Sequence, residues 1–339
     1  MKTILRYGTA AAVAVALMGA TGAAQAKLKR ITIGTNPSGT VYYLIGSGFA
    51  KTFQQKLNIR STAQPYAGST VYVPLYAKGE MTLGLNNSMD SGAAYRGTGD
   101  YKGRQLKTVR ALVRFWVIPY TFMVRADSGI KSIADLRGKK VVTKIKAVTS
   151  LTNLSVRILE TAGLSNSTVT AMDSGNLVRN IDLVVEGRAD AAPVAYSMPA
   201  VRKANATVPG GIRLLPLGPK ATDSFMDEGV PGSRTAIAKP SKQRPFIKQP
   251  TEVAAFDAYL NAGTAVSDED AYTLVKTLYD NWKQLQKDYG PLRGVKANQL
   301  APATNPHPYA AGAVRFYKEA GIWTKANEAQ QEKVLKISQ

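Results

Sequence analysis

Residues 31 to 46 read ITIGTNPSGTVYYLIG. The segment begins with alternating apolar residues, continues through small and turn-forming residues, and ends in an apolar run with two adjacent tyrosines. This pattern predicts a β-strand, a loop and the start of a helix, an arrangement that often binds a small anion. Gly34 and Gly39 have the spacing of a nucleotide phosphate loop, but Thr40 stands where such a loop has its lysine. The donors of this loop therefore suit a carboxylate better than a nucleotide.

The same order of strands and helices recurs along the first two thirds of the chain. Such alternation is typical of α/β units with parallel sheets, and two units predict two lobes. Ligands bind at the carboxyl ends of the strands in open parallel sheets, so the loops that follow the strands are expected to converge on one cleft. The expected strands are 30–35, 59–66, 80–85, 139–144, 167–172 and 188–196, and the expected helices are 41–57, 69–79, 150–163 and 176–187.

The last third of the chain is expected to return to the first lobe. A strand-like segment spans 251–260, and a helix follows with Ser267 as its N-cap and an apolar stripe of Ala271, Leu274, Val275 and Leu278. We predict an α/β, two-lobed fold of the periplasmic-binding-protein type (type II) with a ligand cleft between the lobes. Lobe 1 is discontinuous: the predicted division is 27–123 plus 251–339 for lobe 1 and 124–250 for lobe 2.

The first 26 residues have the features of a secretory signal peptide. Lys2 and Arg6 precede an apolar stretch, and small residues end it at Ala24-Gln25-Ala26. The apolar stretch is too short for a membrane span, which needs about 20 residues. We predict cleavage after Ala26 and a periplasmic location for the exported protein.

The composition excludes several classes of site. The chain has no cysteine, so thiolate catalysis is excluded. It has one histidine, His307, so a multi-histidine metal site is not expected. We expect no metal, no cofactor and no catalytic residue. His307 lies between prolines and is predicted to be a turn or packing residue.

The chain is strongly basic. Its net charge of +21 falls to +19 (42 basic minus 23 acidic residues) when Lys2 and Arg6 are removed with the signal peptide. An excess of this size favours anionic surroundings. The basic residues are spread without a run, and no nucleic-acid recognition motif is present, so we expect no nucleic-acid partner.

Four ordered segments resemble the solute-binding proteins of TRAP transporters, specifically the TAXI family. They are ITIGTNPSGTVYYLIGSGFA (31–50), GSTVYVPLYAKGEMTLGLNNSMDSGAAYRG (68–97), MVRADSGIKSIADLRGKKVV (123–142) and HPYAAGAVRFYKEAGIW (307–323). The resemblance implies a periplasmic receptor with two lobes that closes on a small solute and delivers it to TRAP-type membrane permease subunits. It implies glutamate, glutamine or another small carboxylate as the solute, and contact with the membrane only through the permease.

Twelve residues are candidate ligand contacts. The resemblance implies ligand contacts in the first loop, at the second helix N-terminus, after the third strand and on the second lobe. Three further candidates belong to a segment where this chain departs from the family. That departure is Lys144-Ile145-Lys146-Ala147-Val148-Thr149-Ser150, and a second one is Asn87-Ser88-Met89-Asp90. The candidates are Ser38, Gly39, Thr40, Tyr42, Ser69, Thr70, Ser88, Asp90, Tyr196, Lys144, Thr149 and Ser150.

Some polar and aromatic side chains have a structural role as the alternative to ligand contact. Lys144 is expected to pair with an acidic group of the solute, the alternative being a solvated surface lysine. Consecutive helical residues cannot share a face, so we expect Tyr42 in the pocket and Tyr43 in the core. Trp116 and Tyr120 are expected to be packing residues.

The sequence thus predicts a binding protein and not an enzyme. One alternative is an ABC-type receptor for a sulfonate or phosphonate-like anion. The other is a periplasmic enzyme on the same two-lobed scaffold, which would need a nucleophile, base or metal site that the composition hardly supplies.

Overall fold

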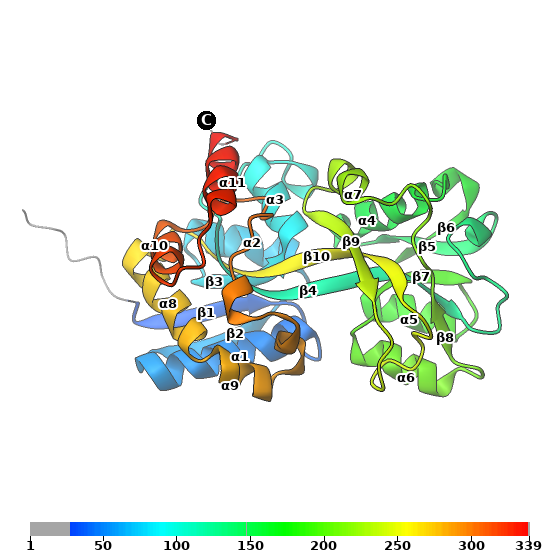
Figure 1. Cartoon of the computed structure of the whole chain (residues 1–339), viewed down its shortest axis with the longest axis horizontal. Helices are drawn as coiled ribbons and strands as arrows, with labels where there is room; N and C mark the ends of the chain where they lie inside the picture. Colours follow the sequence, from blue (N-terminus) through cyan, green and yellow to red (C-terminus); the bar gives the residue numbers. More distant parts are fainter. Residues whose placement is uncertain (1–27, 147, 338–339) are drawn as a thin grey trace, which may run out of the picture.

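The structure is a computed structural model that describes residues 28–146 and 148–337. Two groups of helices and strands lie at the two ends of an elongated molecule, and two long strands, β4 (Arg110–Arg125) and β10 (Thr251–Ala262), run between them (Figure 1). The signal peptide predicted at residues 1–26 lies outside the described residues. Among the residues that the structure describes, no helix has both the length and the apolar character that a membrane crossing requires.

The end of the molecule that contains the N-terminal third has a parallel core of three strands. Strand β1 pairs with β2 on one side and with β3 on the other, and the C-terminal helices pack at this same end (Figure 1). Its elements are β1 (Arg30–Thr35), α1 (Val41–Leu57), β2 (Arg60–Pro65), α2 (Ser69–Lys78), β3 (Leu83–Asn87), α3 (Ser88–Arg96), α8 (Asp268–Asp280), α9 (Trp282–Asp288), α10 (Ala311–Glu319) and α11 (Lys325–Lys336).

The other end repeats the pattern. Strand β5 pairs in parallel with β6 and β7, while β8 and β9 add to the long strands β4 and β10. Its elements are β5 (Lys140–Ile145), α4 (Thr149–Glu160), β6 (Thr170–Ser174), α5 (Leu177–Val185), β7 (Ala191–Ala195), α6 (Pro199–Thr207), β8 (Ile212–Leu214), α7 (Asp223–Gly229) and β9 (Ser233–Ala238).

The long strands join both ends into one mixed sheet. Its order is β2-β1-β3-β10-β4-β7-β5-β6, and β10 is antiparallel to β3, β4 and β9. The expectation of parallel sheets therefore holds within each end but not at the connection. An antiparallel pair forms there because the chain crosses from one end to the other on β4 and returns on β10.

A β-bulge changes which residues of β4 share a face. Ala258 pairs with Trp116, but the next residue, Tyr259, pairs with Arg114, so Phe115 is the extra residue of β4. Successive strand residues point to opposite faces, and a bulge restarts this alternation. Arg114 consequently shares a face with Tyr259, while Trp116 lies on the other face.

The helix ends confirm some local predictions and correct two. Ser267 caps α8 by accepting a hydrogen bond from the Asp270 N–H, and the apolar stripe of this helix is buried as predicted. Ser69 is not the N-cap of α2, because Gly68 holds that position and Ser69 is the first helical residue. Tyr43 is only half-buried, and Tyr42 is the buried member of the pair.

Candidate functional site

A cleft of about 780 Å³ lies between the two ends of the molecule. Each of the six loops that follow the predicted strands contributes to it, as the strand order predicted. The long strands supply its floor. The loops contribute Asn36–Thr40 with Val41 and Tyr42, Ala67 and Ser69, Asn87 and Asp90, Val148 and Leu151, Gly175–Arg179 with Asp182, and Ala195 with Met198–Ala200.

Several helix N-termini meet at this cleft. Thr40 caps α1 with a hydrogen bond from the Tyr43 N–H, and Asn176 caps α5 with bonds from the Val178 and Arg179 N–H groups. In contrast, α2, α4 and α6 start at the cleft without a side-chain cap among the described residues. Uncapped N–H groups and the positive end of the helix dipole both favour a negative charge.

Asp90 is a buried acid at the cleft, in the first turn of α3. Its Oδ2 accepts hydrogen bonds from Ser69 Oγ at 2.5 Å and from Asn87 Nδ2 at 2.8 Å, while Asn87 Oδ1 accepts from the Asp90 N–H at 2.7 Å. Burial raises the pKa of the Asp90 carboxyl, and hydrogen bonds to Ser150 and Ser69 oppose this rise. Ser69 therefore binds Asp90, and Gly68 at the N-cap has no side chain that could bind the first N–H groups of α2.

Ser150 connects the two sides of the cleft beside Asp90, because both Asp90 and Asn87 hydrogen-bond to it. Asn87 Nδ2 donates to Ser150 Oγ at 3.4 Å, and Ser150 belongs to the first turn of α4 on the opposite side. At this distance the bond is a weak one. It shows where the two walls approach each other.

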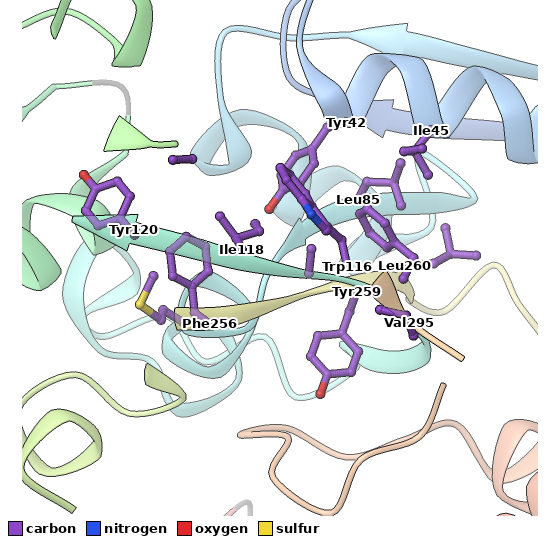
Figure 2. Close-up of a cluster of buried hydrophobic side chains, with 14 of the residues drawn as sticks. Tyr42, Ile45, Leu85, Trp116, Ile118, Tyr120, Phe256, Tyr259, Leu260 and Val295 are labelled. Atoms are coloured by element: carbon purple, nitrogen blue, oxygen red, sulfur yellow. The ribbon is translucent and has the colours of Figure 1, made fainter. Parts of the chain in front are cut away.

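The floor of the cleft is apolar and largely aromatic. Trp116, Ile118 and Tyr120 of β4 and Phe256 of β10 line it, and Figure 2 shows them on the side of the strands that carries Tyr42. Trp116 contacts the Tyr42 ring edge-on, with centroids 6.4 Å apart. The Tyr120 hydroxyl lies 3.2 Å from Ser155 Oγ, so its polar atom already has a partner.

Arg179 is the only basic residue among the described residues that line the cleft. Its guanidinium is already bound to Glu186, with Nη1 to Oε1 at 2.9 Å and Nη2 to Oε2 at 3.2 Å. Two acidic residues, Asp90 and Asp182, line the cleft as well. Charge on the side chains therefore offers little attraction for an anion, and the helix N-termini are the main positive features.

The structure brings together six of the twelve candidate residues. Ser38, Gly39, Thr40, Tyr42, Ser69 and Asp90 line the cleft. Ser150 reaches its edge through Asn87, as described above. Thr149 starts the same helix and is half-buried.

The other candidates lie away from the lining. Thr70 is exposed, Ser88 Oγ donates to the Gly232 carbonyl at 3.3 Å, and Tyr196 is buried beneath the Arg244 guanidinium, 5.7 Å from its ring centroid. Lys144 is exposed, with its Nζ 3.7 Å from Asp173 Oδ2. Lys144 thus occupies the position of the alternative weighed for it, a solvated surface lysine.

Sequence reasoning missed most of the apolar lining. Trp116 and Tyr120 were expected to be packing residues, and both are buried, but both also line the cleft. Residues two apart on a strand face the same side, so Trp116, Ile118 and Tyr120 line the cleft together. Asn176 and Val178 line the cleft from the start of the helix predicted at 176–187, although neither is among the twelve candidates.

The single histidine of the chain lies away from the cleft. No group of three or more metal-binding side chains occurs among the described residues. His307 is fully buried, does not line the cleft, and has Nε2 2.8 Å from Asn261 Oδ1. Burial, with the Arg96 and Arg110 charges, lowers the pKa of His307 to about 3. It is a packing residue, as predicted.

Together, the mixed sheet with crossing strands and the cleft between two α/β ends define the two-lobed fold of periplasmic binding proteins. A solved structure with this fold is PhnD1 from Prochlorococcus marinus MIT 9301 in complex with methylphosphonate, with a TM-score of 0.54 at 13% identity over 87% of this chain and 99% of that one. The chain itself belongs to the NMT1-like family, whose model matches residues 33–321.

Other solved structures are similar at lower scores. The periplasmic aliphatic sulphonate binding protein SsuA from Escherichia coli has a TM-score of 0.44 at 14% identity, over 90% of this chain and 92% of that chain. An ancestral arginine-binding protein bound to arginine has a TM-score of 0.47 at 16% identity, over 77% of this chain and 98% of that chain.

Proposed function

We propose that this protein is the extracytoplasmic solute-binding subunit of a TRAP-type secondary transporter of the TAXI family, and that it captures a small anionic solute. The observation that carries the anion is the meeting of the uncapped N-termini of α2 and α4 at one cleft. Their N–H groups and dipoles favour negative charge. The four segments that resemble TAXI proteins support the transporter type.

The proposed mechanism is binding followed by closure of the lobes. The solute contacts N–H groups and hydroxyls from both walls, and only the closed form makes all of these contacts at once. Asn87 and Ser150 already approach each other across the cleft. The twelve candidate residues and the lobe division at 123/124 and 250/251 belong to this proposal, as do a signal peptide at residues 1–26, a periplasmic location and delivery to TRAP-type permease subunits.

A thermal-shift screen tests the binding function. The exported form starting at Lys27 is mixed with small mono- and dicarboxylates, amino acids, sulfonates and phosphonates. A solute that binds only the folded state raises the melting temperature, by an amount that corresponds to about 2.7 kcal/mol at a concentration of 100 Kd. Stabilisation by organic anions supports the proposal, and stabilisation by neutral or cationic compounds alone contradicts it.

An ABC-type receptor for a sulfonate or phosphonate-like anion is the second candidate. It is favoured by the fold shared with PhnD1, which binds methylphosphonate in its solved structure. The energy source of transport separates the two candidates. Solute uptake that depends on this protein and on an ion gradient supports the TRAP assignment, whereas uptake that depends on ATP supports the ABC assignment.

A periplasmic enzyme on the same scaffold is the third candidate. It requires a base or nucleophile in the cleft, and Asp90 is the buried acid available there. Recovery of the bound solute unchanged after denaturation of the protein supports a receptor. A chemically altered solute supports the enzyme.

A further inference from the structure

The cleft floor and the charges around it limit the kind of anion that fits. Trp116 is 8% exposed, Ile118 is 4% exposed and Phe256 is 2% exposed in the described structure. These side chains lie side by side on the long strands and face the cleft (Figure 2). A polar or charged group placed on Ile118 or Phe256 would lose water without gaining a hydrogen-bond partner from either side chain.

The wall from the second lobe extends this apolar surface. Val148, Leu151, Leu177 and Val178 line the cleft from α4 and α5, and Val178 is 47% exposed. Apolar side chains thus stand on the floor and on the α4 and α5 wall. Removal of such surface from water by an apolar ligand is favourable in proportion to its area.

The charged side chains of the cleft disfavour a second negative group on the solute. A dicarboxylate needs a partner for each carboxylate, but the guanidinium of Arg179 is already bound to Glu186. Lys144 does not line the cleft and lies beside Asp173. Asp90 and Asp182 would repel a second carboxylate.

We infer that the solute of this cleft carries a single negative headgroup on a bulky apolar body, aromatic or branched aliphatic, and is neither a dicarboxylate nor glutamate. The headgroup is held by the open helix N-termini, and the body covers the floor formed by Trp116, Ile118 and Phe256. This inference rests on the proposed binding function and names the solute class. An arylalkyl carboxylate and the corresponding α-amino acid share the required chemistry.

Calorimetric titration with four matched compounds tests the inference. They are 3-phenylpropionate, phenylalanine, glutarate and glutamate. We expect 3-phenylpropionate or phenylalanine to bind at least about tenfold more tightly than glutarate and glutamate. The phenyl ring of the first two compounds covers the apolar floor, where the other two would place a second carboxylate. Preference for phenylalanine over 3-phenylpropionate identifies an amino acid as the solute, through an ammonium group near Asp90, and the opposite preference identifies a simple carboxylate.

The failures of the two proposals are distinguishable in the same experiment. Tighter binding of glutarate or glutamate overturns the apolar body and leaves the anion receptor in place. If none of the four compounds binds, and the wider screen finds only neutral or cationic ligands, the receptor for an anion is overturned as well.

Paired variants locate the apolar contact. Ile118→Thr puts a hydroxyl on the floor of the cleft. Val117→Thr is the matched control, because it puts a hydroxyl at the adjacent residue of β4, whose side chain points to the opposite face. We expect the first to weaken binding of the apolar anion about three- to tenfold and the second to change it by less than about twofold. Equal affinities of the two variants would overturn the assignment of the floor.

A second pair of variants tests the apolar contact at exposed positions, in case Ile118→Thr fails to fold. Val178 and Val71 are valines in the first turns of α5 and α2, 47% and 46% exposed, and only Val178 lines the cleft. Val178→Thr is isosteric, and we expect about a threefold loss of affinity for the apolar anion with unchanged melting temperature. Val71→Thr should change neither, and an equal loss in both variants would contradict the inference.

Discussion

The two faces of the long strands β4 and β10 differ in polarity: one is apolar, and the other carries buried charged side chains. On the cleft face Trp116, Ile118 and Phe256 present an apolar surface. On the opposite face Asp257 is 3% exposed and binds two arginines, Arg114 at 3.4 Å and Arg234 at 2.8 Å. The first face is open to a ligand, and the second is closed by the protein itself.

The bulge at Phe115 makes this separation possible. Without it, Arg114 and Trp116 would be two residues apart on a regular strand, and Arg114 would share the cleft face with Trp116. With it, Arg114 turns to the closed face, where Nη2 donates to the Gln299 carbonyl at 2.6 Å. A single extra residue thus removes a positive charge from the cleft. Substitutions on the closed face should therefore affect stability, and those at the cleft should affect binding.

The largest effect is expected from Asp257→Asn. This change leaves Arg114 buried without a counter-charge and should lower the free energy of unfolding by about 3–5 kcal/mol, as other broken buried ion pairs do. Arg234→Gln is the matched control, because the Arg234 side chain is 26% exposed and its loss leaves Arg114 beside Asp257. Urea unfolding measures both. A loss below about 1 kcal/mol for Asp257→Asn would show that the closed face does not hold the fold.

The second effect is a dependence of stability on pH through His307. This side chain packs edge-on against Tyr259, with centroids 5.5 Å apart (Figure 2 shows Tyr259 pointing away from the cleft face). Its folded pKa is about 3, below the ordinary value of about 6.5. Above pH 6.5 both states are neutral. As the pH falls from 6.5 toward 3, only the unfolded chain gains the proton, so stability is lost.

Between pH 7 and pH 5 this linkage amounts to about 2 kcal/mol of unfolding free energy. His307→Gln should remove that part of the pH dependence even if the variant is less stable at pH 7. Urea unfolding of both proteins at the two pH values provides the measurement. Identical pH slopes for the two proteins would contradict the neutral state of buried His307.

At the cleft, Asp90→Asn should strengthen binding of the anionic solute. The amide can accept the same hydrogen bonds from Ser69 and Asn87 but carries no negative charge, so repulsion of the solute falls. We expect a gain of about fivefold in affinity at pH 7, roughly 1 kcal/mol. Burial raises the pKa of Asp90, so wild-type affinity should increase as the pH falls through that pKa.

Calorimetry at a series of pH values compares the two proteins. The affinity of Asp90→Asn should be insensitive to pH over the range in which Asp90 titrates. A loss of affinity for a simple carboxylate in the variant would instead mean that the Asp90 carboxylate contacts the solute favourably.

The sequence predicted the framework of the cleft better than its surface. Strand 30–35 and helix 41–57 match β1 and α1 to the residue, because alternation and helical spacing report on burial. The apolar floor was missed because a strand buried on both faces reads as one continuous apolar run, which cannot say which residues face a cleft. The bulge at Phe115 cannot be predicted from a single sequence, because no residue pattern marks its position. The bulge nevertheless determines to which face Arg114 points.

The smallest effect is expected from Lys144→Met, which tests a candidate that lies outside the cleft lining. Lys144 and Lys146 lie 3.7 and 3.8 Å from Asp173 Oδ2, and their side chains are 60% and 65% exposed. Both lysines therefore pair with one surface acid, and either can replace the other. Exposed pairs of this kind contribute less than about 1 kcal/mol. We expect Lys144→Met to leave stability and solute affinity unchanged within error, with Lys146→Met as the control. A loss of affinity in Lys144→Met alone would mean that Lys144 swings into the cleft when the lobes close, and that side-chain charge as well as helix N-termini holds the anion.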